Sequence, residues 1–239
     1  MARSFFLLNP IYAFADSRLL FWKQEDGSLF LNNIKPSSDK DGLTAAYIGA
    51  SNHDDLTFYH DIFEPAMEQI GVDQCRMILT RPLPDDGMFL QEADIILLAG
   101  GSVETGWRAF ENNGFKELIP RRFYDGAVLV GISAGAVQLG LGGLTDDGTK
   151  PLTTFSLLPF YVEVHEESGT WTSLSDTLSH AQTQTRGISI PGGGGIIYNP
   201  LTGDVEPICK PIIEILMENG ISREAIILPG SAEEDKISK

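Results

Sequence analysis

Short apolar runs alternate with amphipathic segments through the middle of the chain. Residues 127–130 form a short, continuous apolar run of the kind that a buried parallel strand requires, and strands are also expected at 43–49, 76–79 and 94–98. Apolar side chains recur at helical spacing in 54–70, and a further helix is expected from Glu104. Strands that alternate with helices in this way predict an α/β fold, in which a mostly parallel sheet is covered by helices on both faces.

The two ends of the chain follow other patterns. Residues 19–22 and 28–31 are largely apolar and lie on either side of Asp26-Gly27, a pair that predicts the turn of a β-hairpin. We therefore expect residues 1–36 to form an N-terminal strand and hairpin elaboration ahead of the main sheet. Residues 230–239 are polar and charged, which predicts a frayed tail.

Composition and charge narrow the class of partner. A chain of 239 residues is long enough for one substantial core, so residues 1–239 are expected to form a single α/β domain. The formal net charge of −16 argues against nucleic acid and against anionic membranes as partners. No apolar run approaches the roughly 18 residues that a membrane span needs. Cys75 and Cys209 are far apart in the sequence and are expected to be reduced, which favours a cytoplasmic location.

One hexapeptide carries the strongest chemical signal. Residues 131–136 read Gly-Ile-Ser-Ala-Gly-Ala, and they follow an apolar strand and precede a segment that can open a helix. A serine between two glycines at such a corner is the nucleophile elbow pattern. Ser133 is therefore a candidate nucleophile, and the N–H of Ala134, near a helix N-terminus, is a candidate oxyanion donor. A buried packing turn is the alternative interpretation.

A serine hydroxyl needs a base that removes its proton, and the chain has four histidines. His53 lies where it could reach the ends of the strands, whereas His60 belongs to an exposed helix face and His180 to a polar surface segment. His165 ends a strand-like run, 160–165, and is the favoured base. Its alternative role is that of a structural histidine.

Three acidic residues compete to orient this histidine. Glu167 follows His165 by two positions, and on a strand the two side chains would share a face. Asp146 and Asp147 lie between the serine and the histidine in the sequence and are the alternative acids. An Asp-Asp-Gly turn is the plainer account of that pair.

A second oxyanion donor is expected from the strand that runs into Gly100-Gly101. Glycine lets the backbone approach a substrate closely, so the N–H of Gly101 is the candidate. Ser102 follows directly and is a candidate substrate-binding residue. Arg108, on the helix after it, could meet a substrate carboxylate, although an exposed helical arginine is the simpler interpretation.

These pieces together resemble one known family. The segments 98–102, 130–136 and 158–165 resemble the serine peptidase family of dipeptidase E and cyanophycinase, within the flavodoxin-like fold of the class I glutamine amidotransferase-like superfamily. The resemblance implies that Ser133 is the nucleophile and His165 its base. It also implies that Gly101 lends an oxyanion N–H, as does Ala134.

The sequence departs from the family pattern at two places. The family usually has Asn or Asp where this chain has Ser102. Its acid usually lies between the serine and the histidine, which favours Asp146 or Asp147 over Glu167. Members that cleave after aspartyl residues need a basic pocket, and no motif here identifies one.

We therefore expect a serine hydrolase that cleaves amide bonds in small peptides or amino-acid-derived amides and needs no metal or organic cofactor. Its partner is a small substrate, and the sequence leaves a homodimer open. A binding or regulatory module that keeps the fold without turnover is the second hypothesis. An α/β-hydrolase esterase is the third, but that fold places its histidine late, whereas the last histidine here is His180.

Overall fold

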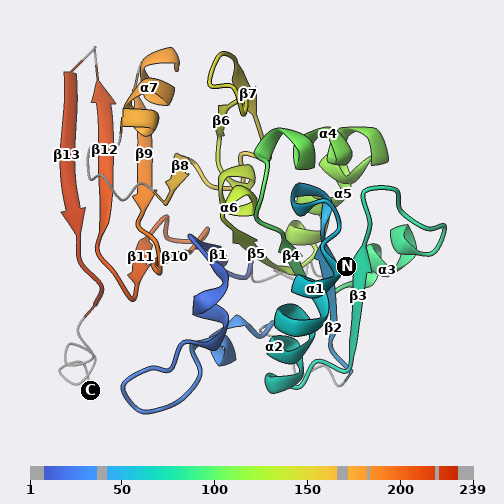
Figure 1. Ribbon diagram of the computed structural model, residues 1–239. Helices are drawn as coiled ribbons and strands as arrows, with labels where there is room; N and C mark the ends of the chain where they lie inside the picture. Colours follow the sequence, from blue (N-terminus) through green and yellow to red (C-terminus); the bar gives the residue numbers. More distant parts are fainter. Residues whose placement is uncertain (1–7, 37–41, 166–171, 182–183, 219–220, 231–239) are drawn as a thin grey trace, which may run out of the picture.

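A seven-stranded sheet forms the centre of the protein (Figure 1). The computed structural model describes residues 8–36, 42–165, 172–181, 184–218 and 221–230. The strands lie in the order β11-β10-β1-β5-β4-β2-β3; the last five pair in parallel, whereas β10 and β11 are antiparallel. The predicted α/β class with a mostly parallel sheet is confirmed. The strands are β1 (Ile11–Phe14), β2 (Thr44–Ile48), β3 (Gln74–Ile78), β4 (Ile95–Leu98), β5 (Val128–Ile132), β10 (Gly195–Tyr198) and β11 (Val205–Ile208).

Helices cover both faces of this sheet, as the alternating pattern predicts. One face packs against α3 (Asp86–Glu92), α4 (Val103–Asn113), α5 (Phe115–Tyr124) and α6 (Ala134–Leu139). The other face packs against the 3-10 turns η1 (Ser17–Phe21) and η2 (Phe30–Ile34), and against α1 (Leu56–Phe58), the π-helical turn η4 (Tyr59–Phe63) and α2 (Glu64–Gln69). A further 3-10 turn, η3 (Ala50–Asn52), follows β2.

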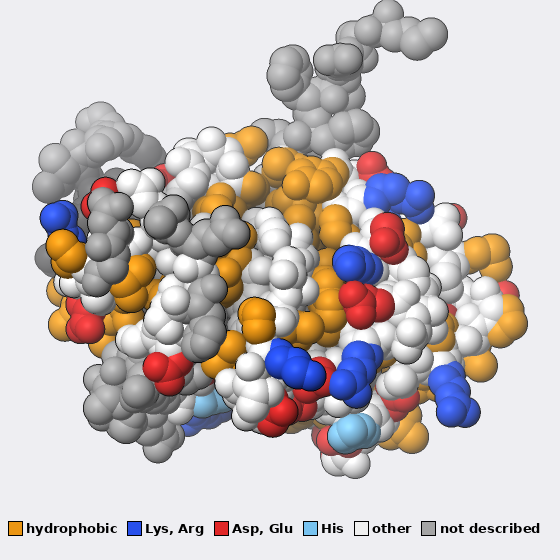
Figure 2. All heavy atoms as spheres, turned by 90° about the horizontal axis from the view of Figure 1, so that it is seen from above, with side chains coloured by type: hydrophobic (Ala, Val, Ile, Leu, Met, Phe, Trp, Pro, Cys, Tyr) orange, Lys and Arg blue, Asp and Glu red, His pale blue; other side chains and the backbone are white. Residues whose placement is uncertain are grey.

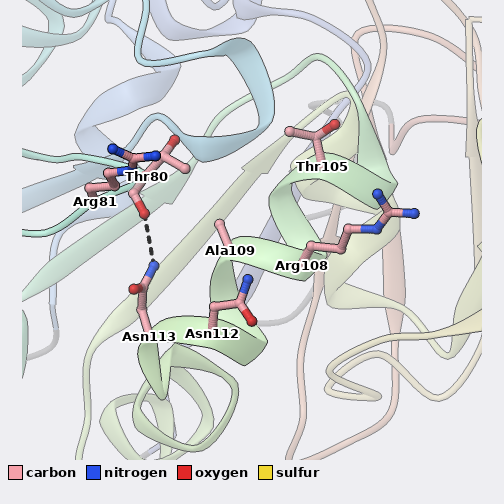
Figure 3. Close-up of a pocket in the computed structure, with 7 residues that line it drawn as sticks. All are labelled: Thr80, Arg81, Thr105, Arg108, Ala109, Asn112 and Asn113. Atoms are coloured by element: carbon pink, nitrogen blue, oxygen red, sulfur yellow. Dashed lines mark hydrogen bonds between the residues drawn. The ribbon is translucent and has the colours of Figure 1, made fainter.

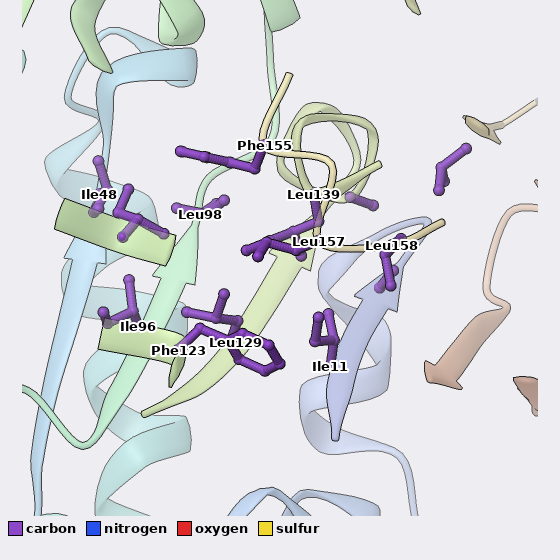
Figure 4. Packing of buried hydrophobic residues seen from close by; sticks show 14 of the residues in the cluster. Ile11, Ile48, Ile96, Leu98, Phe123, Leu129, Leu139, Phe155, Leu157 and Leu158 are labelled. Atoms are coloured by element: carbon purple, nitrogen blue, oxygen red, sulfur yellow. The ribbon is translucent and has the colours of Figure 1, made fainter. Parts of the chain in front are cut away.

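The core consists of two apolar layers, one on each face of the sheet. In β4, Ile96 and Leu98 point into the layer beneath α4 and α5, whereas Ile95 and Leu97 point into the other. All four side chains are fully buried. This alternation follows from the two-residue period of a strand, and Figure 4 shows Ile96 and Leu98 among the buried side chains of the first layer. Because both faces of the sheet are covered, β4 is apolar at every position.

The N-terminal segment differs from the expected elaboration. β1 lies between β5 and β10 inside the main sheet, so these residues belong to the core and not to a separate hairpin. The expected hairpin around Asp26-Gly27 is reduced to one antiparallel bridge between Lys23 and Leu29. The flanking apolar runs form the 3-10 turns η1 and η2, because their side chains pack against the sheet face and do not pair with each other.

A second, four-stranded sheet lies beside the first and is seen at the left of Figure 1. Its order is β13-β12-β9-β8, and α7 (Thr172–His180) packs against β8, β9 and β12. Between the two sheets, β6 and β7 form a short hairpin. These strands are β6 (Gly142–Leu144), β7 (Pro151–Thr153), β8 (Tyr161–Val164), β9 (Thr185–Ile190), β12 (Ile212–Glu218) and β13 (Ile221–Ile227).

Charged side chains of both signs lie together on one face of the protein. Over the face seen in Figure 2, Lys and Arg side chains are interspersed with Asp and Glu, and the described atoms there form no continuous basic area. Within the described ranges, no helix has both the length and the apolar character needed to cross a bilayer.

Candidate active site

Ser133 occupies a strained corner between β5 and α6. Its backbone adopts φ 51° and ψ −111°, a conformation that residues other than glycine rarely adopt. The neighbouring glycines make the corner possible: a Cβ on Gly131 would lie 2.5 Å from the Gly135 carbonyl oxygen, and one on Gly135 would lie 2.3 Å from that of Leu98. The Ser133 N–H donates to the Phe14 carbonyl at 2.8 Å, which ties the corner to β1.

His165 meets this serine from the other sheet. It follows β8 directly, has a positive φ of 70°, and its N–H donates to the Ile190 carbonyl of β9 at 3.2 Å. Its Nε2 lies 3.0 Å from Ser133 Oγ, within hydrogen-bond distance. The residue is exposed, so the imidazole lies at the rim of the site. Two residues that are 32 positions apart in sequence thus form a nucleophile–base pair in geometry.

The glycine loop after β4 lies against the same serine. A Cβ on Gly100 would be 3.2 Å from the Ser133 Cβ. Gly101 has φ 116°, and a Cβ there would be 2.1 Å from the Ser51 carbonyl oxygen, so a side chain does not fit. Among the described residues nothing accepts a hydrogen bond from the Gly101 N–H. Ala134 is the first residue of α6, so its N–H has no intrahelical acceptor.

Sequence and fold comparisons agree with this geometry. The sequence profile of peptidase family S51 matches residues 21–198, which is most of the chain. The chain belongs to peptidase family S51. This is the family of dipeptidase E and cyanophycinase that the motifs resemble, and the resemblance is therefore confirmed.

Two solved structures share the S51 fold at low sequence identity. A peptidase from an acI-B1 Actinobacterium superposes with a TM-score of 0.72 at 14% identity, over 95% of this chain and 96% of that one. A candidate peptidase E protein from Listeria monocytogenes EGD-e gives 0.62 at 16% identity, over 84% of this chain and 98% of that one. No curated protein sequence matches the chain significantly.

The three acidic residues that could orient His165 differ in their surroundings. Asp147 accepts hydrogen bonds from Thr145 and Thr149 in an exposed turn; the Thr145 hydroxyl foremost lowers its pKa to about 2. Asp146 accepts from Ser102 Oγ at 2.5 Å. Glu167 lies outside the described residues. Among the carboxylates that are described, none forms a hydrogen bond or ion pair with the His165 ring.

Ser102 caps the N-terminus of α4. Its Oγ accepts from the Thr105 N–H at 2.9 Å, as an N-cap does, and donates to Asp146. The hydroxyl that replaces the family's usual amide or carboxylate thereby joins the glycine loop to the β6–β7 hairpin. This use of Ser102 leaves its role as a substrate-binding residue a proposal.

Arg108 lies on an outer flank of α4. It pairs with Glu104 one turn earlier, and its side chain is 70% exposed. It helps to line an open pocket of about 380 Å³, in which Figure 3 shows Asn113 donating to the Thr80 carbonyl. Neither Ser133 nor His165 lines this pocket. A role in holding a substrate carboxylate therefore stays a prediction.

The remaining histidines lie away from Ser133 Oγ or outside the described side chains. His53 has a left-handed backbone after η3 and is exposed, and His60 pairs with Glu64 on a helical surface, as expected. The side chain of His180 is not among those described. In the described part of the chain, no group of three or more His, Cys, Asp or Glu side chains is arranged to hold a metal ion.

Sequence reasoning missed one neighbour of the site. Ser51 follows β2, and its carbonyl accepts from the Ser102 N–H at 2.9 Å, so it supports the glycine loop. The signal available was positional: the carboxyl ends of parallel strands meet at one edge of a sheet, and β2 neighbours β4.

Proposed function

We propose that this S51 protein is a serine-type hydrolase that cleaves amide bonds in small peptides or amino-acid-derived amides. The observation that carries the proposal is the 3.0 Å separation of Ser133 Oγ and His165 Nε2 at a strained elbow. A hydroxyl becomes an effective nucleophile when a base is positioned to take its proton. Strain of this kind persists only where the surrounding structure holds it, and it is concentrated at functional sites.

In the proposed reaction, His165 Nε2 takes the Ser133 proton as Oγ attacks the amide carbonyl carbon. The carbonyl oxygen becomes an oxyanion that the N–H groups of Gly101 and Ala134 stabilise. His165 then protonates the leaving amine, the C–N bond breaks, and an acyl-serine forms. Water attacks this ester with His165 as base, which releases the acid and restores Ser133.

We propose Glu167 as the residue that orients His165. The shared strand face expected for the two residues does not support this, because β8 ends at Val164 and His165 has φ 70°. What supports it is that the alternatives are already engaged: Asp146 binds Ser102, whereas Asp147 holds a turn. A carboxylate on Nδ1 would fix the tautomer in which Nε2 is free to accept the serine proton. Glu167→Gln should then lower the acylation rate more than Asp147→Asn does.

The proposal is tested by labelling the purified protein with a fluorophosphonate, which reacts with activated serines whatever their substrate. The wild-type protein should label, and Ser133→Ala and His165→Ala should not. Ser156→Ala is the matched control, because Ser156 is an exposed serine that also has a positive φ, 54°. It should label as the wild type does.

Two outcomes contradict the proposal. Labelling that survives in Ser133→Ala would place the reactive group elsewhere. A folded wild-type protein that neither labels nor hydrolyses a panel of small-peptide anilides would favour the binding module without turnover.

A further inference from the structure

A buried polar side chain links the serine elbow to the glycine loop. Gln138 lies on α6, five residues after Ser133, and is fully buried. Its Nε2 donates to Ser51 Oγ and to the Val103 carbonyl, both at 3.0 Å. The first of these partners lies after β2 and the second is the first residue of α4, so one amide group joins three elements around the site.

Ser51 carries this link onward to the candidate oxyanion donor. It is 2% exposed; its hydroxyl accepts from Gln138, and its carbonyl accepts from the Ser102 N–H. The same carbonyl is the atom against which Gly101 packs. A displacement of Ser51 would therefore move the Gly101 loop, because no side chain lies between them to absorb it.

A glycine in α4 leaves room for the hydrogen bond between Gln138 and Ser51. Gly106 lies inside α4, where glycine costs about 1 kcal/mol relative to alanine. A Cβ there would lie 2.0 Å from Ser51 Oγ and 2.5 Å from Gln138 Nε2. Gln138 Oε1 finds no hydrogen-bond partner among the described residues. Turning the amide over would set Oε1 against the Val103 carbonyl, so the orientation with Nε2 donating is the favourable one.

We propose that Gln138 is a positioning residue that holds the two oxyanion donors in register, an inference that rests on the proposed function. Ala134 N–H belongs to the helix that carries Gln138, and Gly101 N–H belongs to the loop that Ser51 supports. Donors stabilise an oxyanion most when they are fixed before reaction, and small displacements are costly. Gln138 itself touches no reacting atom.

The test compares Gln138→Met with Thr154→Val as a matched control. Met nearly conserves volume and removes both donated bonds. Thr154 is also buried, and its hydroxyl donates to the Gly140 carbonyl just after the far end of α6, so its loss is a structural change of the same kind. The fluorophosphonate labelling rate is measured against probe concentration, which separates the maximal rate from half-saturation.

Gln138→Met should lower the maximal labelling rate about 10- to 100-fold, with half-saturation little changed. Thr154→Val should lower the urea midpoint and leave the maximal rate near that of the wild type. Wild-type labelling in Gln138→Met, or an equal fall in Thr154→Val, would overturn the inference. Loss of wild-type labelling in Ser133→Ala tests the proposed function separately, so the two can fail independently.

A second variant keeps the test decisive if Gln138→Met does not fold. Ser51→Ala removes one acceptor and leaves the bond to Val103 in place. It should also lower the maximal rate, and the double variant should be no slower than Gln138→Met alone, because both act through one hydrogen bond. An unchanged rate in Ser51→Ala, or effects that multiply, would overturn the role given to this link.

Discussion

The two halves of the candidate site come from sheets of very different construction. Ser133 and the glycine loop belong to the main sheet, whose strands are buried on both faces. His165 follows β8 of the second sheet. One face of that sheet joins the main core through Val162, Ile188 and Ile190, whereas the face under α7 is held only by a small cluster around Leu174, Leu178 and Ile215. At its far edge, all residues of β13 from 221 to 226 are exposed.

The two halves of the candidate site need different degrees of rigidity. The elbow and the oxyanion donors need fixed geometry, because their effect depends on being aligned before the reaction. The base must move a proton and remain accessible, and a less enclosed sheet allows that. We infer that the nucleophile depends on the stability of the whole core, whereas the base depends on the local stability of the second sheet.

The largest effect on the labelling rate is expected at Gly101, where the main sheet leaves no room for a side chain. Gly101→Ala would place a Cβ 2.1 Å from the Ser51 carbonyl at φ 116°, so the loop must move and its N–H with it. The fluorophosphonate labelling rate should fall by about 100-fold or more, as loss of one oxyanion donor does elsewhere. Gly148→Ala is the control, because it also has a positive φ but nothing within 4 Å of its Cβ. Equal labelling in the two variants would contradict this prediction.

A smaller effect is expected from loosening the second sheet. Leu178→Ala removes a side chain that is 1% exposed and packs against β9, at a local cost of about 2–5 kcal/mol. Labelling should fall by several-fold, and amide hydrogen exchange should rise in β8 and β9 while β4 and β5 stay protected. Leu90→Ala, in the main core, should cost similar stability without changing labelling below its unfolding transition. The reverse pattern would refute the division between the sheets.

The parts of the fold that the sequence predicted are those specified locally. The strands expected at 94–98 and 127–130 correspond to β4 and β5, and the elbow was recognised because its glycines and flanking apolar residues are adjacent. β1 was not recognised as a sheet strand, since its partners lie more than a hundred residues away. The segment 54–70 was expected as one helix, but it divides into α1, a π-helical turn and α2.

In the candidate site, too, the sequence predicted the residues that have a local signal and missed the long-range contacts. A strand-like run that ends in His165 suggested a base, and the fold brings it to Ser133. The use of Asp146 by Ser102, 44 residues away, had no local signal, so the choice among the acids stayed open in the sequence. The link from Gln138 to Ser51 spans 87 residues and was likewise invisible.

A still smaller, pH-dependent effect is expected at the joint between the two sheets. Asp16 follows β1, and its carboxylate accepts from the Gly193 N–H of the loop between β9 and β10. The Arg18 side chain foremost lowers the pKa of Asp16 to about 2. A lowered pKa stabilises the folded state above the unfolded pKa near 4, and this contribution is lost as pH falls through 2.

Asp16→Asn should therefore cost about 1 kcal/mol at pH 7, since the group is partly exposed and its hydrogen bonds are only weakened. The difference in urea midpoint between the variant and the wild type should shrink between pH 4 and pH 2. Asp204→Asn, in an exposed turn, is the control and should show no such convergence. A difference that stays constant with pH would mean that the charge of Asp16 is not what joins the sheets.

The smallest effect is expected at the outer strand of the second sheet. Ile226 is 69% exposed, so Ile226→Lys removes little buried area and should change the free energy of unfolding by no more than about 0.5 kcal/mol. Its partner across the ladder, Ile213, packs against the α7 cluster, so Ile213→Lys should destabilise the second sheet and slow labelling. The pair is compared by urea unfolding and by labelling rate. If Ile226→Lys slowed labelling as much, His165 would depend on the whole second sheet and not on the part that α7 covers.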